Sequence, residues 1–318
     1  MTAPTPDPVL AEDAAGDRFV DLPAGPRLCF RTEGPDAGVP LLLIAGLGID
    51  LTSWPQRMVD GFVGRGFRVV RFDNRDIGRS TRIATPPPGR LRQLLARPRP
   101  DAYDLADMAA DTVGLLDSLG IDRVHLVGMS MGGMIAQTVA ARHPARVASL
   151  TSIFSTTGDR RVGQPARSTL ARLARGPART VEESVERHLG MLRHIGSPTA
   201  LPDDDLERAW AVGLWERSGG VAARAGVPRQ ISAIQASGDR TAELRRITAP
   251  TLVVHGSTDR MVHPTGGRAT ADAVPGARHV EIPELGHHLA PGVVDQLVEL
   301  STDLARSAGA PLPAGDAR

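Results

Sequence analysis

Val124-His125-Leu126-Val127-Gly128-Met129-Ser130-Met131-Gly132-Gly133-Met134-Ile135 is the stretch that decides the fold of this 318-residue chain. An apolar run typical of a strand precedes Ser130, and a run typical of a helix follows it. In this Gly-x-Ser-x-Gly pattern, the two flanking glycines remove side chains that would clash where a strand reverses sharply into a helix. The pattern predicts a serine hydroxyl held above a sheet, with a helix N-terminus behind it to favour negative charge. This is the setting of a nucleophile.

Strands and helices alternate on both sides of this corner. We predict strands at residues 18–22, 27–32, 39–45, 67–72, 124–127, 147–154, 252–255 and 279–282, and helices at residues 54–63, 104–119, 131–143 and 293–304. The first two strands form a hairpin-like start, and the alternation that follows implies right-handed crossovers and parallel strands. The expected fold class is α/β, with a mostly parallel eight-stranded sheet flanked by helices.

Residues 155–247 interrupt the alternation. Strand-like runs disappear there, and helical spacing appears at residues 181–195, 203–215 and 229–236, which predicts a helical cap inserted after the sixth strand. The core of the fold would then comprise residues 18–154 and 248–307. Residues 1–17 and 308–318 are small, polar and rich in proline or glycine, so we expect flexible tails there. Residues 84–101 are rich in proline and arginine and are expected to be irregular.

Composition excludes several kinds of partner and cofactor. A hydrophobic content of 41% and a net charge of +1 are typical of a soluble globular protein without a nucleic-acid partner. The chain has no lysine, which excludes a P-loop and Schiff-base chemistry, and its one cysteine, Cys29, excludes internal disulfides. The histidines lack ligand-type spacing, so we expect no metal and no other cofactor.

No stretch approaches 18 apolar residues, and the N-terminal segment has neither a basic start nor an apolar run. We therefore expect a cytoplasmic protein without a membrane partner, and the sequence leaves open whether it is a monomer or a homodimer.

A serine nucleophile needs a base, and the base needs an orienting carboxylate. Both should lie on loops after later strands, where a parallel sheet presents its carboxyl ends. Asp259 follows the strand at 252–255, and His287 and His288 follow the strand at 279–282. Asp159, which follows the strand at 147–154, is the alternative acid. Physical reasoning does not separate the two adjacent histidines.

The chain resembles the α/β-hydrolase superfamily from about residue 18 to residue 306. The segments DNRDIGRS (73–80), GMSMGGMIAQ (128–137) and TAELRRITAPTLVV (241–254) resemble the esterases related to aclacinomycin methylesterase. The order serine, acid, histidine along the chain is also that of this superfamily. The resemblance implies the α/β-hydrolase fold, Ser130 as nucleophile, His287 as general base and then acid, and Asp259 as the orienting carboxylate. It also implies an oxyanion hole made by the backbone N–H groups of Leu47 and Met131.

Gly46 and Gly48 would let the oxyanion loop approach the substrate closely. The family often has His-Gly at this point, whereas this chain has Ala45-Gly46, so support for the loop must come from elsewhere. The charged run at residues 73–80 is predicted to brace the neighbouring catalytic loops. Further candidates for substrate contact are Gly46, Gly48, Trp54, Met129, Trp210, Trp215 and His288, although packing in the core is an equal alternative for each tryptophan.

The function predicted is hydrolysis of a carboxylic ester, such as a methyl ester or lactone of a medium-sized apolar or polycyclic small molecule. A cofactor-free perhydrolase or haloperoxidase and a carbon–carbon bond hydrolase would use the same triad. A remoter alternative is a dinucleotide-binding oxidoreductase, because Gly46-Leu47-Gly48 follows a strand and the next strand runs into Asp73. The third glycine of that motif is missing, since residue 51 is leucine. A non-catalytic binding module would leave the filled triad positions unexplained.

Overall fold

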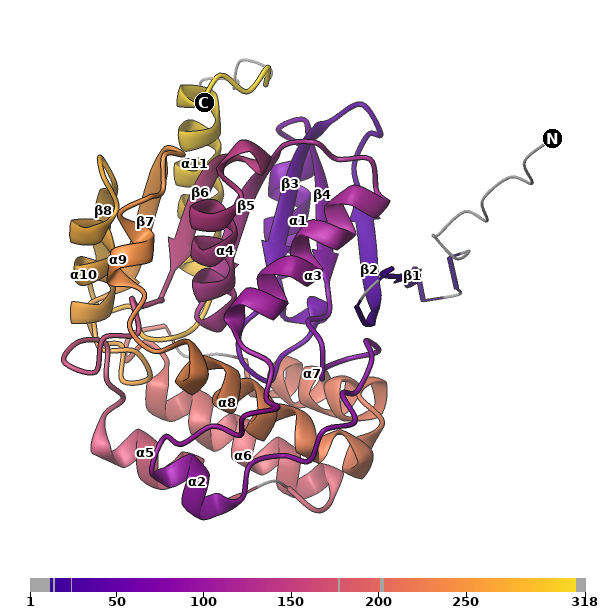
Figure 1. Ribbon diagram of the computed structural model, residues 1–318, viewed down its shortest axis with the longest axis vertical. Coiled ribbons are helices and arrows are strands. Elements are labelled where there is room, and N and C mark those ends of the chain that lie inside the picture. The colour runs from indigo at the N-terminus through magenta and orange to yellow at the C-terminus, as the bar shows by residue number, and fades with distance from the viewer. Residues whose placement is uncertain (1–11, 14, 24, 177, 201–202, 313–318) are drawn as a thin grey trace.

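The computed structural model describes residues 12–13, 15–23, 25–176, 178–200 and 203–312. Eight strands form one sheet in the order β1-β2-β4-β3-β5-β6-β7-β8 (Figure 1). Their bounds are β1 (Arg18–Asp21), β2 (Arg27–Glu33), β3 (Val39–Ile44), β4 (Phe67–Phe72), β5 (Val124–Met129), β6 (Val147–Ile153), β7 (Thr251–Gly256) and β8 (Arg278–Ile282). The pairs β1–β2 and β2–β4 are antiparallel and the other five pairs are parallel. The predicted α/β class and mostly parallel eight-stranded sheet are confirmed.

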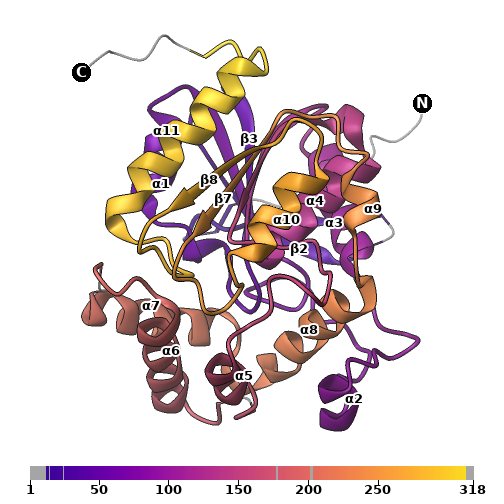
Figure 2. The ribbon, with the colours of Figure 1, turned by 90° about the vertical axis from the view of Figure 1, so that its left-hand side faces the viewer.

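Helices cover both faces of the sheet, as Figure 2 shows. One face carries α1 (Gln56–Val63) and α11 (Pro291–Ser307), and the other carries α3 (Leu105–Ser118), α4 (Met131–Arg142) and α10 (Thr265–Ala273). The central strands β5 and β6 are buried along their whole length, and their sequences are mostly apolar or made of small residues. Two short 3₁₀ turns, η1 (Leu51–Ser53) and η2 (Pro144–Arg146), complete the connections.

The chain between β6 and β7 is helical. Its elements are α5 (Arg167–Leu173), α6 (Val181–Ile195), α7 (Asp204–Arg217), η3 (Gly220–Ala225), α8 (Gly226–Ser237) and α9 (Thr241–Leu244). We call residues 155–247 the helical insertion. In both views α5, α6, α7 and α8 lie together beyond one end of the sheet (Figures 1 and 2). A short helix, α2 (Arg90–Leu94), lies beside them. It corrects the expectation that residues 84–101 are irregular throughout.

Buried ion pairs tie the helical insertion to the sheet. Arg217, at the end of α7, lies 2.7 Å from carboxylate oxygens of both Asp50 and Asp73. Arg229 of α8 makes a two-pronged contact with Asp76, at 2.8 and 2.6 Å. These aspartates are fully buried, so removing either arginine would leave an uncompensated charge in the interior. The loops that follow β3 and β4 therefore fix where α7 and α8 sit.

Most residues of the predicted flexible tails, namely 1–11, 14 and 313–318, lie outside the described residues. Asp17, at the end of the predicted N-terminal tail, is buried and paired with Arg31 at 2.7 Å. In the part of the chain that the structure describes, no helix is long and apolar enough to cross a membrane.

Candidate active site

Ser130 occupies the corner between β5 and α4. Its φ of 55° and ψ of −121° place it in a backbone region that side chains rarely adopt, and its N–H donates to the carbonyl of Ile153 at 2.8 Å. A Cβ at Gly128 would lie 2.3 Å from the carbonyl oxygen of Gly132, and one at Gly132 would lie 2.0 Å from that of Ile44. Both positions therefore require glycine, because the obstructing atoms are backbone that cannot move aside.

Asp259 and His287 form a hydrogen-bonded pair at the ends of β7 and β8. The distance between Asp259 Oδ2 and His287 Nδ1 is 2.7 Å. The other oxygen of Asp259 accepts from the N–H groups of Met261 and Val262, at 2.8 and 2.9 Å. Burial by itself would raise the pKa of Asp259, but His287 and His255 outweigh it and lower this pKa to about 2. The carboxylate is thus ionised and fixed in orientation, as the partner of a general base must be.

The lowered pKa of Asp259 predicts how the stability of the fold depends on pH. Because that pKa lies below the ordinary 3.8, ionised Asp259 stabilises the fold above about pH 4, and this contribution disappears as the pH falls from 4 to 2. The shift corresponds to roughly 2–3 kcal/mol of unfolding free energy. Urea unfolding of the wild type and Asp259→Asn should be measured at pH 5 and pH 3. The difference in unfolding free energy between the two proteins, here called the gap, should be smaller at pH 3. A gap that stays constant would contradict this account.

Ser130 lies at the same end of the sheet as the Asp259–His287 pair. Phe154 directly follows Ile153, the acceptor for the Ser130 N–H, and its ring centroid is 5.5 Å from that of His287. Among the described residues, the Ser130 hydroxyl makes no hydrogen bond. The alternative acid, Asp159, is instead paired with Arg161 at 2.7 Å. The structure therefore brings Asp259 to the histidine and leaves Asp159 elsewhere.

The two adjacent histidines have different partners. His288 Nε2 lies 3.4 Å from Glu207 of α7, whose other carboxylate oxygen is 2.8 Å from His188 of α6. His287 faces Asp259, and its backbone N–H donates to the carbonyl of Ile195 at 2.6 Å. The geometry thus separates two residues that the sequence could not, and it ties the His287 loop to the end of α6.

The loop at residues 45–50, which carries the predicted oxyanion donor Leu47 and is called the oxyanion loop below, passes beside the serine corner. A Cβ at Gly46 would lie 3.3 Å from that of Ser130. The Asn74 side-chain amide donates to the carbonyl of Ala45 at 3.1 Å, and Asp73 accepts from the N–H of Leu51 at 2.9 Å. The prediction that the run at residues 73–80 braces the neighbouring loops is confirmed by these contacts. Asn74 supplies support that the Ala45-Gly46 sequence itself lacks.

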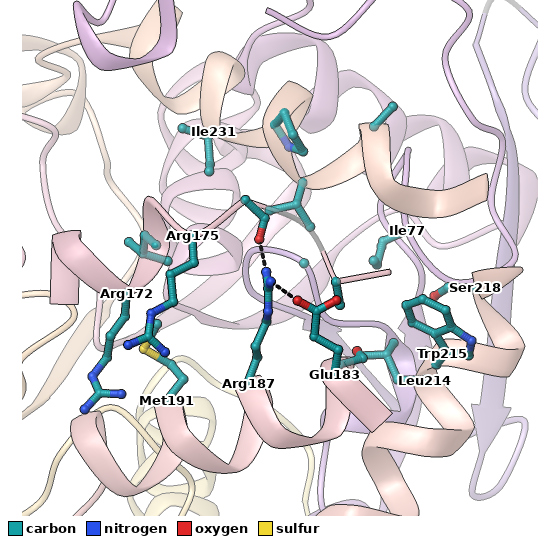
Figure 3. Close-up of a pocket in the computed structure, with 18 of the residues that line it drawn as sticks. Ile77, Arg172, Arg175, Glu183, Arg187, Met191, Leu214, Trp215, Ser218 and Ile231 are labelled. Atoms are coloured by element: carbon teal, nitrogen blue, oxygen red, sulfur yellow. Dashed lines mark hydrogen bonds and ion pairs between the residues drawn. The ribbon is translucent and has the colours of Figure 1, made fainter. Parts of the chain in front are cut away.

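A cavity of about 850 Å³ lies among the helices of the insertion (Figure 3). Gly48 and Trp215, two of the predicted substrate contacts, line it, together with Ile77 and Leu214. Ser130 and His287 are not among the described residues that line it, whereas Gly48 of the loop after β3 is.

The other predicted contact residues lie outside this cavity. Trp54 is 1% exposed and packs in the core, which corrects the expectation that it contacts substrate. Met129 is likewise buried in the core. Trp210 packs against the ring of His188, with centroids 4.9 Å apart, and its indole N–H donates to Thr52 at 3.1 Å. Met131, the second predicted oxyanion donor, is the first residue of α4 and is fully buried.

Arginines that the sequence did not single out also line the cavity. Figure 3 shows Arg187 joined to Glu183, with Arg175 and Arg172 on the other side of Arg187. Met191 follows on the same face of α6, because Glu183, Arg187 and Met191 are spaced by four residues. That spacing is the signal that could have placed them together. In the described part of the chain, no group of three or more His, Cys, Asp or Glu side chains is placed to hold a metal ion.

Comparison with known proteins agrees with this geometry. Residues 39–290 match the family model described as alpha/beta hydrolase fold. The chain is 32% identical to rhodomycin D methylesterase DauP of Streptomyces sp. (strain C5) and 31% identical to rhodomycin D methylesterase DnrP of Streptomyces peucetius. Each alignment covers 83% of this chain and 90% of the relative.

The fold is also similar to a crystal structure of the enol-lactonase from Burkholderia xenovorans LB400. The TM-score is 0.72 and the identity is 24%, with 91% of this chain and 99% of that chain covered. The sequence resemblance to methylesterases is confirmed, and the chain is an enzyme that belongs to the α/β-hydrolase fold family.

Proposed function

We propose that the chain hydrolyses a carboxylic ester by way of an acyl-enzyme. The observation that carries this proposal is the 2.7 Å hydrogen bond between buried, ionised Asp259 and His287, at the sheet end where Ser130 stands on its strained corner. The methylesterase relatives support an ester as the substrate class. In the oxidoreductase alternative Gly46 would face a dinucleotide, whereas here it packs beside Ser130.

The proposed residues account for every proton. Ser130 Oγ attacks the ester carbonyl while His287 Nε2 takes its proton, and Asp259 stabilises the imidazolium that forms. The N–H groups of Leu47 and Met131 hold the negative oxygen of the tetrahedral intermediate. His287 then gives its proton to the leaving alkoxide, which departs as the alcohol. Water attacks the acyl-enzyme carbonyl while His287 takes one of its protons. The bond to Ser130 Oγ then breaks, His287 returns the proton to that oxygen, and the carboxylic acid is released. This chemistry needs no cofactor.

The helical insertion would act as a cap that selects the substrate, over a core formed by residues 18–154 and 248–307. Its cavity has the volume of a drug-sized pocket, with Trp215, Leu214 and Ile77 on its wall. We therefore propose a medium-sized apolar or polycyclic small molecule that carries a methyl ester or lactone. A cytoplasmic location stays a prediction.

A substrate panel tests the proposal. It contains p-nitrophenyl butyrate, a polycyclic aromatic methyl ester, an aryl lactone, a vinylogous diketone, and hydrogen peroxide with a halogenation acceptor. We expect cofactor-free hydrolysis of the esters and lactone, with the highest kcat/KM for the polycyclic methyl ester. Diketone cleavage or halogenation without ester hydrolysis would overturn the proposal in favour of the other chemistries. Thermal stabilisation by a nicotinamide dinucleotide would point to the oxidoreductase.

A further inference from the structure

Gln230 of α8 is a fully buried glutamine whose amide is engaged at both ends. Its Oε1 accepts from the N–H of Gly48 at 2.9 Å, and its Nε2 donates to the carbonyl of Arg75 at 2.9 Å. A backbone N–H can only donate and a carbonyl can only accept, so these partners fix which way the amide points. The glutamine joins the helical insertion to the oxyanion loop.

The contact acts on one particular peptide plane. The Gly48 N–H belongs to the peptide that joins Leu47 to Gly48, and Gln230 pins that plane. Asn74 pins the plane between Ala45 and Gly46 by donating to the Ala45 carbonyl at 3.1 Å. Between these two lies the peptide that carries the N–H of Leu47. Its orientation is therefore determined from both sides.

The loop needs such constraints because of its glycines. Gly48 has a φ of 71°, and glycine populates both signs of φ at little cost, so a loop with Gly46 and Gly48 has several conformations open to it. Donors stabilise an oxyanion only when they already point at it. An unpinned loop would spend part of its time with the Leu47 N–H turned away.

The position of Gln230 is itself firmly set. Its neighbour Arg229 makes the buried two-pronged contact with Asp76. At the start of α8, a Cβ on Gly226 would lie 2.1 Å from the carbonyl oxygen of Asp76, so the helix touches that turn directly. The oxyanion loop and α8 are thus held by the same turn after β4.

We infer that Gln230 is a positioning residue for the oxyanion hole, through which the helical insertion orients the Leu47 N–H. The inference rests on the proposed function, because it takes Leu47 as an oxyanion donor. It gives the insertion a role in the chemical step in addition to enclosing substrate.

The test compares three variants on α8. Gln230→Met keeps the length but removes both hydrogen bonds, and Gln230→Glu keeps an acceptor for the Gly48 N–H. Gln235→Met is the matched control, because Gln235 donates to the carbonyl of Gln93, away from the oxyanion loop. For an ester, we expect Gln230→Met to lower kcat roughly 10- to 100-fold with KM within about threefold, since complete loss of a donor costs about 10²–10³. Gln230→Glu should recover part of the loss, and the control should match the wild type.

A binding measurement separates this role from a structural one. A trifluoromethyl ketone forms an oxyanion with the serine, whereas the corresponding alcohol does not. Gln230→Met should weaken binding of the ketone by the same factor by which it lowers kcat/KM, and it should leave binding of the alcohol unchanged. The inference would be overturned if Gln230→Met kept the wild-type kcat, or if it weakened the binding of the ketone and of the alcohol equally. It would also be overturned if Gln235→Met lowered kcat as much as Gln230→Met does. Failure of the proposed function would look different, because the wild type would then neither hydrolyse esters nor bind the ketone more tightly than the alcohol.

Discussion

Replacing Ser130 with alanine is expected to lower kcat for ester hydrolysis by roughly 10⁴- to 10⁶-fold. The variant has no nucleophile, and only the oxyanion donors and substrate binding remain to accelerate attack by water. The fold should be unaffected, because alanine keeps the Cβ, and the Ser130 hydroxyl makes no hydrogen bond to any residue that the structure describes. The φ of 55° is equally strained for both side chains.

Steady-state kinetics, circular dichroism and labelling by a fluorophosphonate test this expectation together. Peptide mass spectrometry of the wild type should find the label on Ser130 alone. Ser155→Ala is a suitable control and should keep its activity. Ser155 is a buried serine that packs against Gly133 of α4, the helix that begins directly after Ser130. Full activity in Ser130→Ala, or a label on another serine, would refute the assignment.

Local sequence was sufficient for the features that depend on local geometry. The serine corner needs Gly128 and Gly132 because backbone atoms approach within 2.3 and 2.0 Å of where their Cβ atoms would be, and this requirement is visible in the motif. The buried strand β3 was visible as a continuous apolar run. Helix α10 was missed because its sequence, TGGRATADA, combines low helix propensity with no apolar spacing. Packing against the sheet, which no local pattern reveals, stabilises it.

The supports of the site come from distant parts of the chain, and the sequence did not predict their partners. Gln230 is 182 residues from Gly48, and no periodicity links the two. The tryptophans illustrate the same limit, because an aromatic side chain serves a core and a pocket equally well. Trp54 packs in the core, whereas Trp215 lines the cavity. In each case a packing partner far along the chain decided the outcome.

The choice between His287 and His288 also depended on distant partners, and it leads to a sharp prediction. Replacing His287 with glutamine should lower kcat by roughly 10⁴- to 10⁶-fold, because an amide can still contact Asp259 but cannot accept the proton of Ser130. His288→Gln should change kcat by less than about tenfold, since its partner is Glu207 and the loss of one charged contact acts mainly on stability.

Kinetics and urea unfolding of both variants distinguish these roles. We expect both variants to lose some stability, because His287→Gln removes a charged partner of buried Asp259 and His288→Gln removes the contact with Glu207. Only His287→Gln should lose activity, while His288→Gln should keep most of its activity. The opposite pattern would assign the base to His288 and would require the catalytic loop to rearrange around Asp259. Equal loss of activity in both variants would mean that the contact between His288 and Glu207 of the helical insertion is needed to hold His287 in place.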